Sequence, residues 1–266
     1  MGNSFRLNEE KDMSIKNKNV YILGASGKIG LAVAKFLSSK KANVINLDII
    51  QQNYDQIAFE KFNVEELDHK SEEIERITDK YGEPDIFINC SYPRTDEWAE
   101  LTFKKAEFSN LKKNIDLHLV SYIWTANKFA EQMILKKVEG SIILTSSIYG
   151  LVPQRSNLYN GTNIAENFAY TAIKSAINHH CRQMASFFGK NNIRINCISP
   201  GGLEGGVAGQ SFEQDDVFKK KYIERTALKR MCKTSDLVEA YYFLSSPNSK
   251  YITGQNLVID GGFSIN

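Results

Sequence analysis

Short apolar runs alternate along the chain with segments in which apolar residues recur at helical spacing. Each run has the length and composition of a buried strand, and their order is VYILG, ANVINLD, the weaker IAFEKFNV, DIFINC, GSIILTSS, IRINCIS and NLVID. Strands of this kind, separated by crossover helices, are typical of a parallel sheet that is covered on both faces. The pattern therefore predicts a parallel sheet of about seven strands.

The segments between these runs predict the helices. Helical spacing covers residues 28–40, 65–82 and 108–133, begins again near Ala169, and recurs twice before the last run. The alternation indicates a doubly wound α/β fold of Rossmann type. No internal repeat, low-complexity tract or Pro/Gly linker divides the sequence, so we expect one domain over residues 19–266. Residues 1–18 are polar and lack the apolar stretch of a secretion signal, and we expect them to form a flexible arm.

Composition narrows the class of protein. The chain has 266 residues, of which 42% are hydrophobic, and a formal net charge of +2. This charge favours neither nucleic acid nor an anionic membrane as a partner, and no apolar run approaches the ~20 residues of a membrane span. The cysteines lack metal-ligand or redox-pair spacing. We therefore expect no metal site and a cytoplasmic protein with reduced thiols at Cys90, Cys181, Cys197 and Cys232.

The first strand runs into a glycine-rich turn, YILGASGKIG, that opens the first helix. A turn in this place is typical of a dinucleotide site, because the free N–H groups of the helix N-terminus favour phosphate. Gly24 would permit the turn, Gly27 would let the backbone approach a pyrophosphate, and Gly30 would allow close packing of the helix. We expect the other cofactor contacts of the turn to come from Ser26, Lys28 and Ile29. A purely structural turn is the alternative.

Asp48 ends the second strand, about 20 residues farther along, where a carboxylate can accept the hydroxyls of an adenosine ribose. Because a carboxylate would repel a 2′-phosphate, Asp48 favours NAD over NADP. Lys28 argues the other way, since a basic residue in the turn could meet that phosphate. The sequence predicts NAD, with NADP as the alternative.

The candidate chemistry lies in AYTAIK, where Tyr170 and Lys174 are four residues apart and share one face of a helix. A free tyrosine has a pKa of ~10, and a neighbouring ammonium group lowers that pKa toward a useful acid/base range. Ser146 and Ser147 end the strand in IILTSS, at the edge of an α/β sheet where ligands bind. Amphipathic packing is the alternative for the Tyr–Lys pair taken alone.

Together with these residues, further stretches make the chain similar to the short-chain dehydrogenase/reductase family from about Asn19 to the C-terminus. The matching stretches are the glycine turn, Asp48, INCS, TSSIYG, YTAIK, IRINCISPGG and YITGQNLVIDGG. The resemblance implies a nicotinamide-dependent enzyme that interconverts an alcohol and a ketone, usually as a homotetramer or homodimer built on the long helices. It also implies that Tyr170 is the general acid/base, that Ser147 hydrogen-bonds the reacting oxygen, and that Lys174 binds the nicotinamide ribose and lowers the tyrosine pKa.

The resemblance extends to the rest of the cofactor site. It implies that Asn63 and Val64 lie beside the adenine. The residues that it places beside the adenosine ribose are Asn89, Cys90 and Ser91. Those that it places beside the nicotinamide are Pro200, Gly201 and Leu203.

The family's usual catalytic asparagine on the long helix has no clear match. Spacing from Ser147 brings His118 nearest to its position, and Asn114 lies one helical turn earlier. A histidine there could shuttle protons in place of the water that the asparagine anchors, and a packing role is the alternative. The glycine spacing, three and three instead of four and two, is that of the sugar-nucleotide branch of the family.

An insert over about residues 149–168 lies between Ser147 and Tyr170 and is about ten residues longer than in compact members of the family. Its polar and aromatic side chains suit a hydroxyl-rich ligand, and an arginine could hold a carboxylate or phosphate. With SYPRTDEW, the insert resembles dehydrogenases of bacterial flagellin-glycan and nonulosonic-acid pathways, which implies an acidic or nucleotide-linked sugar. The candidate substrate contacts are Arg94, Tyr149, Arg155 and Tyr159; a solvated loop with ordinary surface arginines is the alternative.

Three other functions are compatible with parts of this pattern. A sugar-nucleotide epimerase or dehydratase with tightly bound NAD fits the glycine spacing, but the C-terminal substrate region of that branch is missing. A non-catalytic dinucleotide sensor would be expected to lack the tyrosine. A reductase of 3-ketoacyl chains is disfavoured by the polar insert.

Overall fold

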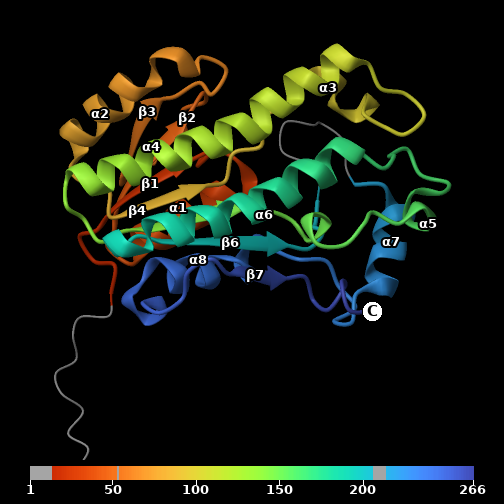
Figure 1. Cartoon of the computed structure of the whole chain (residues 1–266). Coiled ribbons are helices and arrows are strands. Elements are labelled where there is room, and N and C mark those ends of the chain that lie inside the picture. Colours follow the sequence, from red (N-terminus) through yellow and green to blue (C-terminus); the bar gives the residue numbers. More distant parts are fainter. Residues whose placement is uncertain (1–13, 53, 206–213) are drawn as a thin grey trace, which may run out of the picture.

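A single sheet of parallel strands forms the middle of the protein (Figure 1). The computed structural model describes residues 14–52, 54–205 and 214–266, and within them the sheet has seven strands, as predicted. In chain order they are β1 (Asn19–Leu23), β2 (Asn43–Asp48), β3 (Ile57–Lys61), β4 (Ile86–Asn89), β5 (Ser141–Thr145), β6 (Arg194–Pro200) and β7 (Asn256–Ile259). Their order across the sheet is β3-β2-β1-β4-β5-β6-β7, and every neighbouring pair is parallel.

Helices cover both faces of this sheet, which confirms the doubly wound α/β fold. One layer contains α1 (Lys28–Ser39) and α8 (Val238–Ser245), and the other contains α2 (Lys70–Tyr81), α4 (Ser121–Leu135) and α6 (Phe168–Phe188). Three further helices are α3 (Phe108–Asn114), α5 (Ser156–Tyr159) and α7 (Asp216–Arg225). They lie on the right of Figure 1, with α3 beyond the end of α4, and α5 and α7 beyond the carboxyl ends of β6 and β7.

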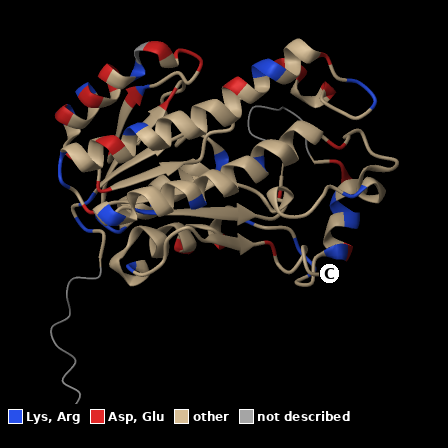
Figure 2. Ribbon diagram, viewed as in Figure 1, with Lys and Arg blue, Asp and Glu red and all other residues tan. Residues whose placement is uncertain are grey.

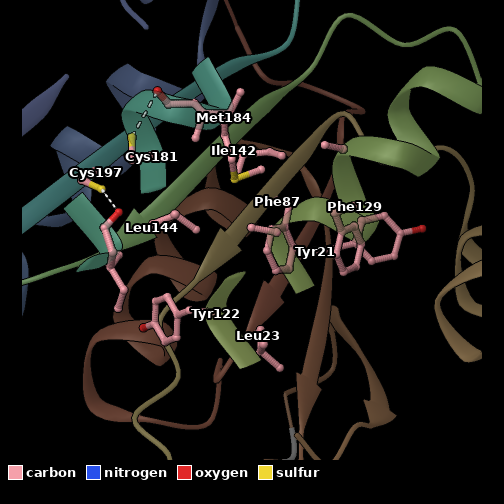
Figure 3. Close-up of a cluster of buried hydrophobic side chains, with 14 of the residues drawn as sticks. Tyr21, Leu23, Phe87, Tyr122, Phe129, Ile142, Leu144, Cys181, Met184 and Cys197 are labelled. Atoms are coloured by element: carbon pink, nitrogen blue, oxygen red, sulfur yellow. Dashed lines mark hydrogen bonds between the residues drawn. The ribbon is translucent and has the colours of Figure 1, made fainter. Parts of the chain in front are cut away.

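Side chains of the strands alternate between two apolar cores, one on each face. On β1, Tyr21 packs in the core beneath α4 and α6, and Ile22 packs in the core beneath α1 and α8. In the first of these cores the rings of Phe87 and Phe129 stack with centroids 4.0 Å apart (Figure 3). The apolar runs of the sequence are therefore buried on both sides, as a parallel sheet requires.

The four cysteines are free thiols. Cys181 and Cys197 lie in the core beneath α4 and α6, where the Cys181 thiol donates to the carbonyl of Ile195 (Figure 3). Burial raises the pKa of the Cys197 thiol well above its ordinary value. These are inert packing residues.

Charged side chains of both signs are interspersed over the outer helices (Figure 2). On β3, Glu60 pairs with Arg76 and Lys80 of α2, and these hydrogen bonds lower the pKa of the carboxyl against the opposing effect of its partial burial. Among the described residues, every helix is too short or too polar to cross a membrane.

Two expectations about element boundaries need correction. The helix predicted over 108–133 is α3 and α4 joined by a π-helical segment, Ile115–Val120. The packed domain begins before residue 19, because Ile15 is buried and Asn17 donates its N–H to the carbonyl of Lys41. The rest of the predicted arm, residues 1–13, lies outside the described residues.

The strand order positions the ligand site. The chain moves from β1 outward to β2 and β3, then crosses back to β4 on the other side of β1. This reversal opens a crevice at the carboxyl ends of β1 and β4, where doubly wound folds bind ligands. The glycine turn follows β1 and the Ser91 segment follows β4, so both candidate cofactor segments reach this crevice.

Candidate active site

The glycine turn has the geometry that its three glycines predict. Gly24 has φ of +83°, and a Cβ atom there would lie 2.6 Å from the backbone of Ser91. A Cβ atom at Gly30 would lie 2.1 Å from the carbonyl oxygen of Gly24, so the helix packs directly on the turn. At Gly27 the space is more open, with 3.3 Å to that same oxygen.

The N-terminus of α1 presents an electropositive end to the crevice. Gly27 is its N-cap residue, no side chain of the described residues caps it, and no acidic residue occupies its first turn. The unsatisfied N–H groups and the helix dipole therefore remain available to an anion. The Lys28 ammonium group reaches across the crevice and donates to the carbonyl of Glu204, in the segment that follows β6.

Asp48 lies beside the glycine turn, as predicted. One carboxylate oxygen accepts the N–H of Ser26 at 2.9 Å, and the other accepts the N–H of Ile50 at 3.2 Å. These bonds fix the carboxylate at the end of β2 and tie it to the turn. Asn63 is engaged in its own turn, where its Oδ1 accepts the N–H of Glu65, and the adjacent Val64 packs against the core.

Hydrogen bonds with Asn89, β1 and α4 fix the segment after β4. Asn89 is buried, and its Oδ1 accepts the N–H of Ser91 at 3.0 Å and the Ser91 hydroxyl at 2.7 Å. Cys90 donates its N–H to the carbonyl of Leu23, and Tyr122 donates its hydroxyl to the carbonyl of Ser91. The backbone beside the predicted ribose position is thus fixed by the sheet and by α4.

On the opposite side of the crevice, the segment after β6 is also fixed by backbone pairing. Pro200 ends β6, and Gly201 donates its N–H to the carbonyl of Ile259 on β7. A Cβ atom at Gly201 would lie 2.9 Å from the Cα of Asp260, so this residue has to be small. Leu203 forms a parallel bridge with Cys232.

Ser147, Tyr170 and Lys174 meet at the carboxyl end of β5. Ser147 follows the strand and lies beside the Tyr170 hydroxyl, while its Oγ accepts the N–H of Tyr149 at 3.1 Å. Tyr170 lies in the first turn of α6, and the Nζ of Lys174, one turn later, is 5.8 Å from the centroid of its ring. The structure therefore brings the predicted trio together.

Burial determines the direction of the pKa shifts of Tyr170 and Lys174. Burial raises the pKa of Tyr170 above its ordinary value, and the neighbouring Ser147 hydroxyl only partly opposes this effect. Burial also lowers the pKa of Lys174 to about 7, and its Nζ donates to the carbonyl of Thr145 at 3.0 Å. Both shifts favour the neutral forms, and the lowering of the tyrosine pKa by Lys174 stays a prediction for the protonated amine.

The two candidates for the missing asparagine have different environments. Asn114 is buried and committed to structure: its Oδ1 accepts the N–H of Thr95, and its Nδ2 donates to the Thr95 hydroxyl. His118 lies in the π-helical segment with its ring 5.1 Å from that of Tyr92, and neither ring nitrogen has a hydrogen-bond partner among the described residues. Burial, with smaller effects from Lys174 and Arg94, lowers the pKa of His118 well below its ordinary value.

The predicted substrate residues do not all converge. The guanidinium of Arg94 lies 5.1 Å from the centroid of the Tyr92 ring, and Tyr149 has its ring 6.4 Å from that of Tyr170. The hydroxyl of Tyr159, itself part of the insert, accepts a hydrogen bond from Gln154 and lies beside the Tyr149 hydroxyl. Arg155 is exposed where α5 begins. Arg94 and Tyr149 are therefore the candidates nearest to the trio.

Comparison with known proteins places the chain in a family. The family model described as Enoyl-(Acyl carrier protein) reductase matches residues 24–264. Post-translational flagellin modification protein A of Campylobacter coli is 30% identical over 263 residues, and the match covers 94% of this chain and 100% of that protein. The chain belongs to the short-chain dehydrogenase/reductase family. It is an NAD(P)-dependent oxidoreductase.

Solved structures of short-chain dehydrogenases share the whole fold. The enzyme of Leptospira borgpetersenii serovar Hardjo-bovis with bound NAD+ has a TM-score of 0.81 and 28% identity, and the match covers 99% of each chain. The 4-hydroxyisoleucine dehydrogenase complexed with NADH has a TM-score of 0.76 and 29% identity, and the match covers 94% of this chain and 100% of that one.

The crevice of this short-chain dehydrogenase/reductase fits a nicotinamide dinucleotide. Of the three glycines of the turn, Gly27 has the most open surroundings, which lets a pyrophosphate approach the backbone there. The uncapped N-terminus of α1 supplies N–H groups for phosphate oxygens. The fixed carboxylate of Asp48 supplies an acceptor for sugar hydroxyls.

Two aromatic residues of the site were not predicted. The rings of Tyr92 and Trp98 stand edge-on to the Tyr170 ring, with centroids 5.9 Å and 6.2 Å away, and Trp98 donates its indole N–H to the Tyr92 hydroxyl at 3.0 Å. The signal was present in NCSYPR, where Tyr92 replaces the small residue usual in the family. Trp98 gave no comparable signal, because only the fold brings its segment to the start of α6.

Proposed function

We propose that this enzyme is an NAD-dependent dehydrogenase/reductase that interconverts a secondary alcohol and a ketone on an acidic or nucleotide-linked sugar. The observation that carries the proposal is the meeting of Ser147, Tyr170 and Lys174 at the mouth of the dinucleotide crevice. Ser147 lies on one side of the Tyr170 hydroxyl and can hydrogen-bond the reacting oxygen. The Lys174 amine lies on the other side, one helical turn away.

A bound nicotinamide supplies or removes a hydride at the reacting carbon. In reduction, Tyr170 donates its phenolic proton to the carbonyl oxygen, and in oxidation its phenolate accepts the proton of the alcohol. Ser147 donates a hydrogen bond to that oxygen and stabilises the charge that develops on it. In its protonated form Lys174 stabilises the phenolate, and its pKa of about 7 allows it to gain and lose a proton near neutral pH.

We propose that His118 occupies the place of the family's asparagine as a neutral ring. A shuttle through the imidazolium form is disfavoured, because burial holds its pKa well below the ordinary value. Its two ring nitrogens are buried without partners among the described residues, so in the neutral ring one can donate a hydrogen bond and the other can accept one. Asn114 already makes two hydrogen bonds with Thr95, which supports His118 over Asn114 for this role.

The substrate class rests on the side chains around Tyr170. Arg94 presents a guanidinium group on the face of the Tyr92 ring, where a carboxylate or phosphate could pair with it. The Tyr149 hydroxyl is buried beside that of Tyr159, and a hydroxyl-bearing ligand that reached this pair could hydrogen-bond with it. Similarity to a protein named for flagellin modification and to a dehydrogenase of a hydroxylated amino acid supports a polar, acidic substrate.

The cofactor preference follows from Asp48. Its carboxylate would repel the 2′-phosphate of NADP, and we expect kcat/KM with NAD to exceed that with NADP at least ~100-fold, since a repelled and desolvated charge costs a few kcal/mol. Asp48→Ser should reduce this ratio to less than ~10-fold. Initial rates with both nucleotides test this, with the exposed Asp55→Ser as the matched control. A parent enzyme that prefers NADP would assign Lys28, not Asp48, the deciding role.

The proposed function itself is tested by a substrate panel. Reduced nicotinamide is followed by absorbance with gluconate, N-acetylneuraminate, UDP-glucose, UDP-glucuronate and 4-hydroxyisoleucine, and with a 3-hydroxyacyl thioester as the apolar comparison. We expect turnover of an acidic or nucleotide-linked sugar, with lower kcat/KM in Arg94→Gln. Turnover of the thioester alone would refute the substrate class, and conversion of a sugar without net change in nicotinamide would indicate an epimerase or dehydratase.

A further inference from the structure

A single side chain, Asn167, holds the start of α6 in place. Its Oδ1 accepts the backbone N–H of Tyr170 at 2.9 Å, which makes it the N-cap residue of the helix that carries the catalytic tyrosine. Its Nδ2 donates to the carbonyl of Trp98 at 2.8 Å. Only 8% of Asn167 is exposed, so water competes little for either bond.

The same residue joins α6 to the insert. The backbone N–H of Asn167 donates to the Oε1 of Gln154 at 2.8 Å, and the Nε2 of Gln154 donates to the Tyr159 hydroxyl at 2.9 Å. The next residue, Phe168, donates its N–H to the carbonyl of Leu101. The segment after β4 therefore meets, at one point, the insert and the start of α6 that follows the insert in the sequence.

We infer that Asn167 is a positioning residue for Tyr170 and that Gln154 transmits the position of the insert to it. This inference rests on the proposed function, in which Tyr170 exchanges the proton. It assigns to the insert a second role besides substrate contact. A movement of Tyr159 would be transmitted through Gln154 to Asn167, the N-cap residue of α6.

The geometry explains why one asparagine suits this position. Its acceptor fixes the backbone of Tyr170, and its donor fixes the backbone of Trp98, whose ring stands 6.2 Å from the Tyr170 ring. The Asn167 side chain thus fixes the backbone of Tyr170 and also that of Trp98, whose ring packs beside the tyrosine. Proton transfer requires the phenol oxygen to lie within hydrogen-bond reach of the substrate, and a displacement of about 1 Å can cost ~100-fold in rate.

Two substitutions at this position separate the two bonds. Asn167→Ala removes both, and we expect kcat to fall about 10- to 100-fold while the dissociation constant for NAD changes less than about twofold. Asn167→Asp keeps the acceptor for Tyr170 but loses the donor for Trp98, and its kcat should lie between those of the parent and the alanine variant. Gln154→Ala should likewise give an intermediate kcat. The matched control is Asn163→Ala. Asn163 is an exposed asparagine of the same insert, and it donates its backbone N–H, which the substitution keeps, to Asp215.

Hydrogen exchange gives a readout that does not depend on turnover. The Tyr170 amide should exchange about fivefold faster in Asn167→Ala, the factor that loss of a helix cap carries, and at the parental rate in Asn167→Asp and Asn163→Ala. Unchanged exchange in Asn167→Ala would overturn the inference, and so would faster exchange with kcat within about twofold of the parent. If the parent turns over no substrate in the panel, the proposed function fails, and exchange at the Tyr170 amide alone decides the positioning role.

Discussion

Replacement of Tyr170 by phenylalanine is expected to lower kcat about 1,000-fold while leaving the affinity for NAD within about twofold of the parent. The substitution removes one oxygen and keeps the ring. Edge-on packing against Tyr92, Trp98 and Tyr149 is therefore retained, and the start of α6 remains capped by Asn167. What is lost is the group that gives the proton to the reacting oxygen or takes it away. Steady-state turnover and NAD titration by fluorescence measure the two effects.

Tyr242→Phe is the matched control for this experiment. Tyr242 lies on α8, where its ring meets that of Phe36 on the opposite side of the sheet from α6. The control should turn over at the parental rate. If Tyr170→Phe retained more than about a tenth of the parental kcat, the general acid/base would have to be another group, and the role assigned to the trio would be wrong.

The fold was predictable because each strand is short, apolar and separated from the next by a helical pattern. β1 illustrates the reason: Tyr21 and Ile22 belong to cores on opposite faces, so the whole run has to be apolar. The glycine turn was predictable for a related reason. At Gly24 the positive φ favours glycine, so this requirement of the turn is visible in the local sequence.

Other features depend on contacts that no local pattern encodes. The π-helical segment Ile115–Val120 continues the apolar spacing of the helices on either side, so the sequence pattern does not mark it. Trp98 reaches Tyr170 because the segment after β4 folds across the start of α6. Asn167 has a residue type favoured at N-caps, but its bond to Trp98 joins residues that are 69 positions apart.

The pKa values of the site expose a further gap in reasoning from spacing alone. A separation of four residues places Lys174 near Tyr170, but it does not show how far the phenol and the amine are removed from water. In the folded protein burial dominates both groups, raising the pKa of the phenol and lowering that of the amine. Both shifts favour the neutral forms. The site in this state is therefore a neutral phenol beside an amine near its midpoint, held by the Thr145 carbonyl.

The buried amine also has a consequence for stability. Folding lowers the pKa of Lys174 from 10.5 to about 7, so between these two pH values the unfolded chain binds more protons than the folded one. The free energy of unfolding should therefore rise with pH across this window, and the full cost of the buried charge should be present below pH ~7. Lys174→Met removes the titrating group while keeping an unbranched apolar side chain.

We expect Lys174→Met to be more stable than the parent at pH 6 by roughly 2–4 kcal/mol, and this difference to shrink by most of its value at pH 9.5. Urea unfolding of both proteins at the two pH values, at equal ionic strength and protein concentration, measures it. Contributions of all other titrating groups are common to both proteins and cancel in the difference. The exposed Lys250→Met should show no such dependence on pH. A stability difference that stays constant between pH 6 and pH 9.5 would mean that the amine keeps an ordinary pKa in the fold. Lys174 would then carry its full positive charge between pH 6 and pH 9.5. This charge would lower the pKa of the Tyr170 phenol, as the sequence alone predicts.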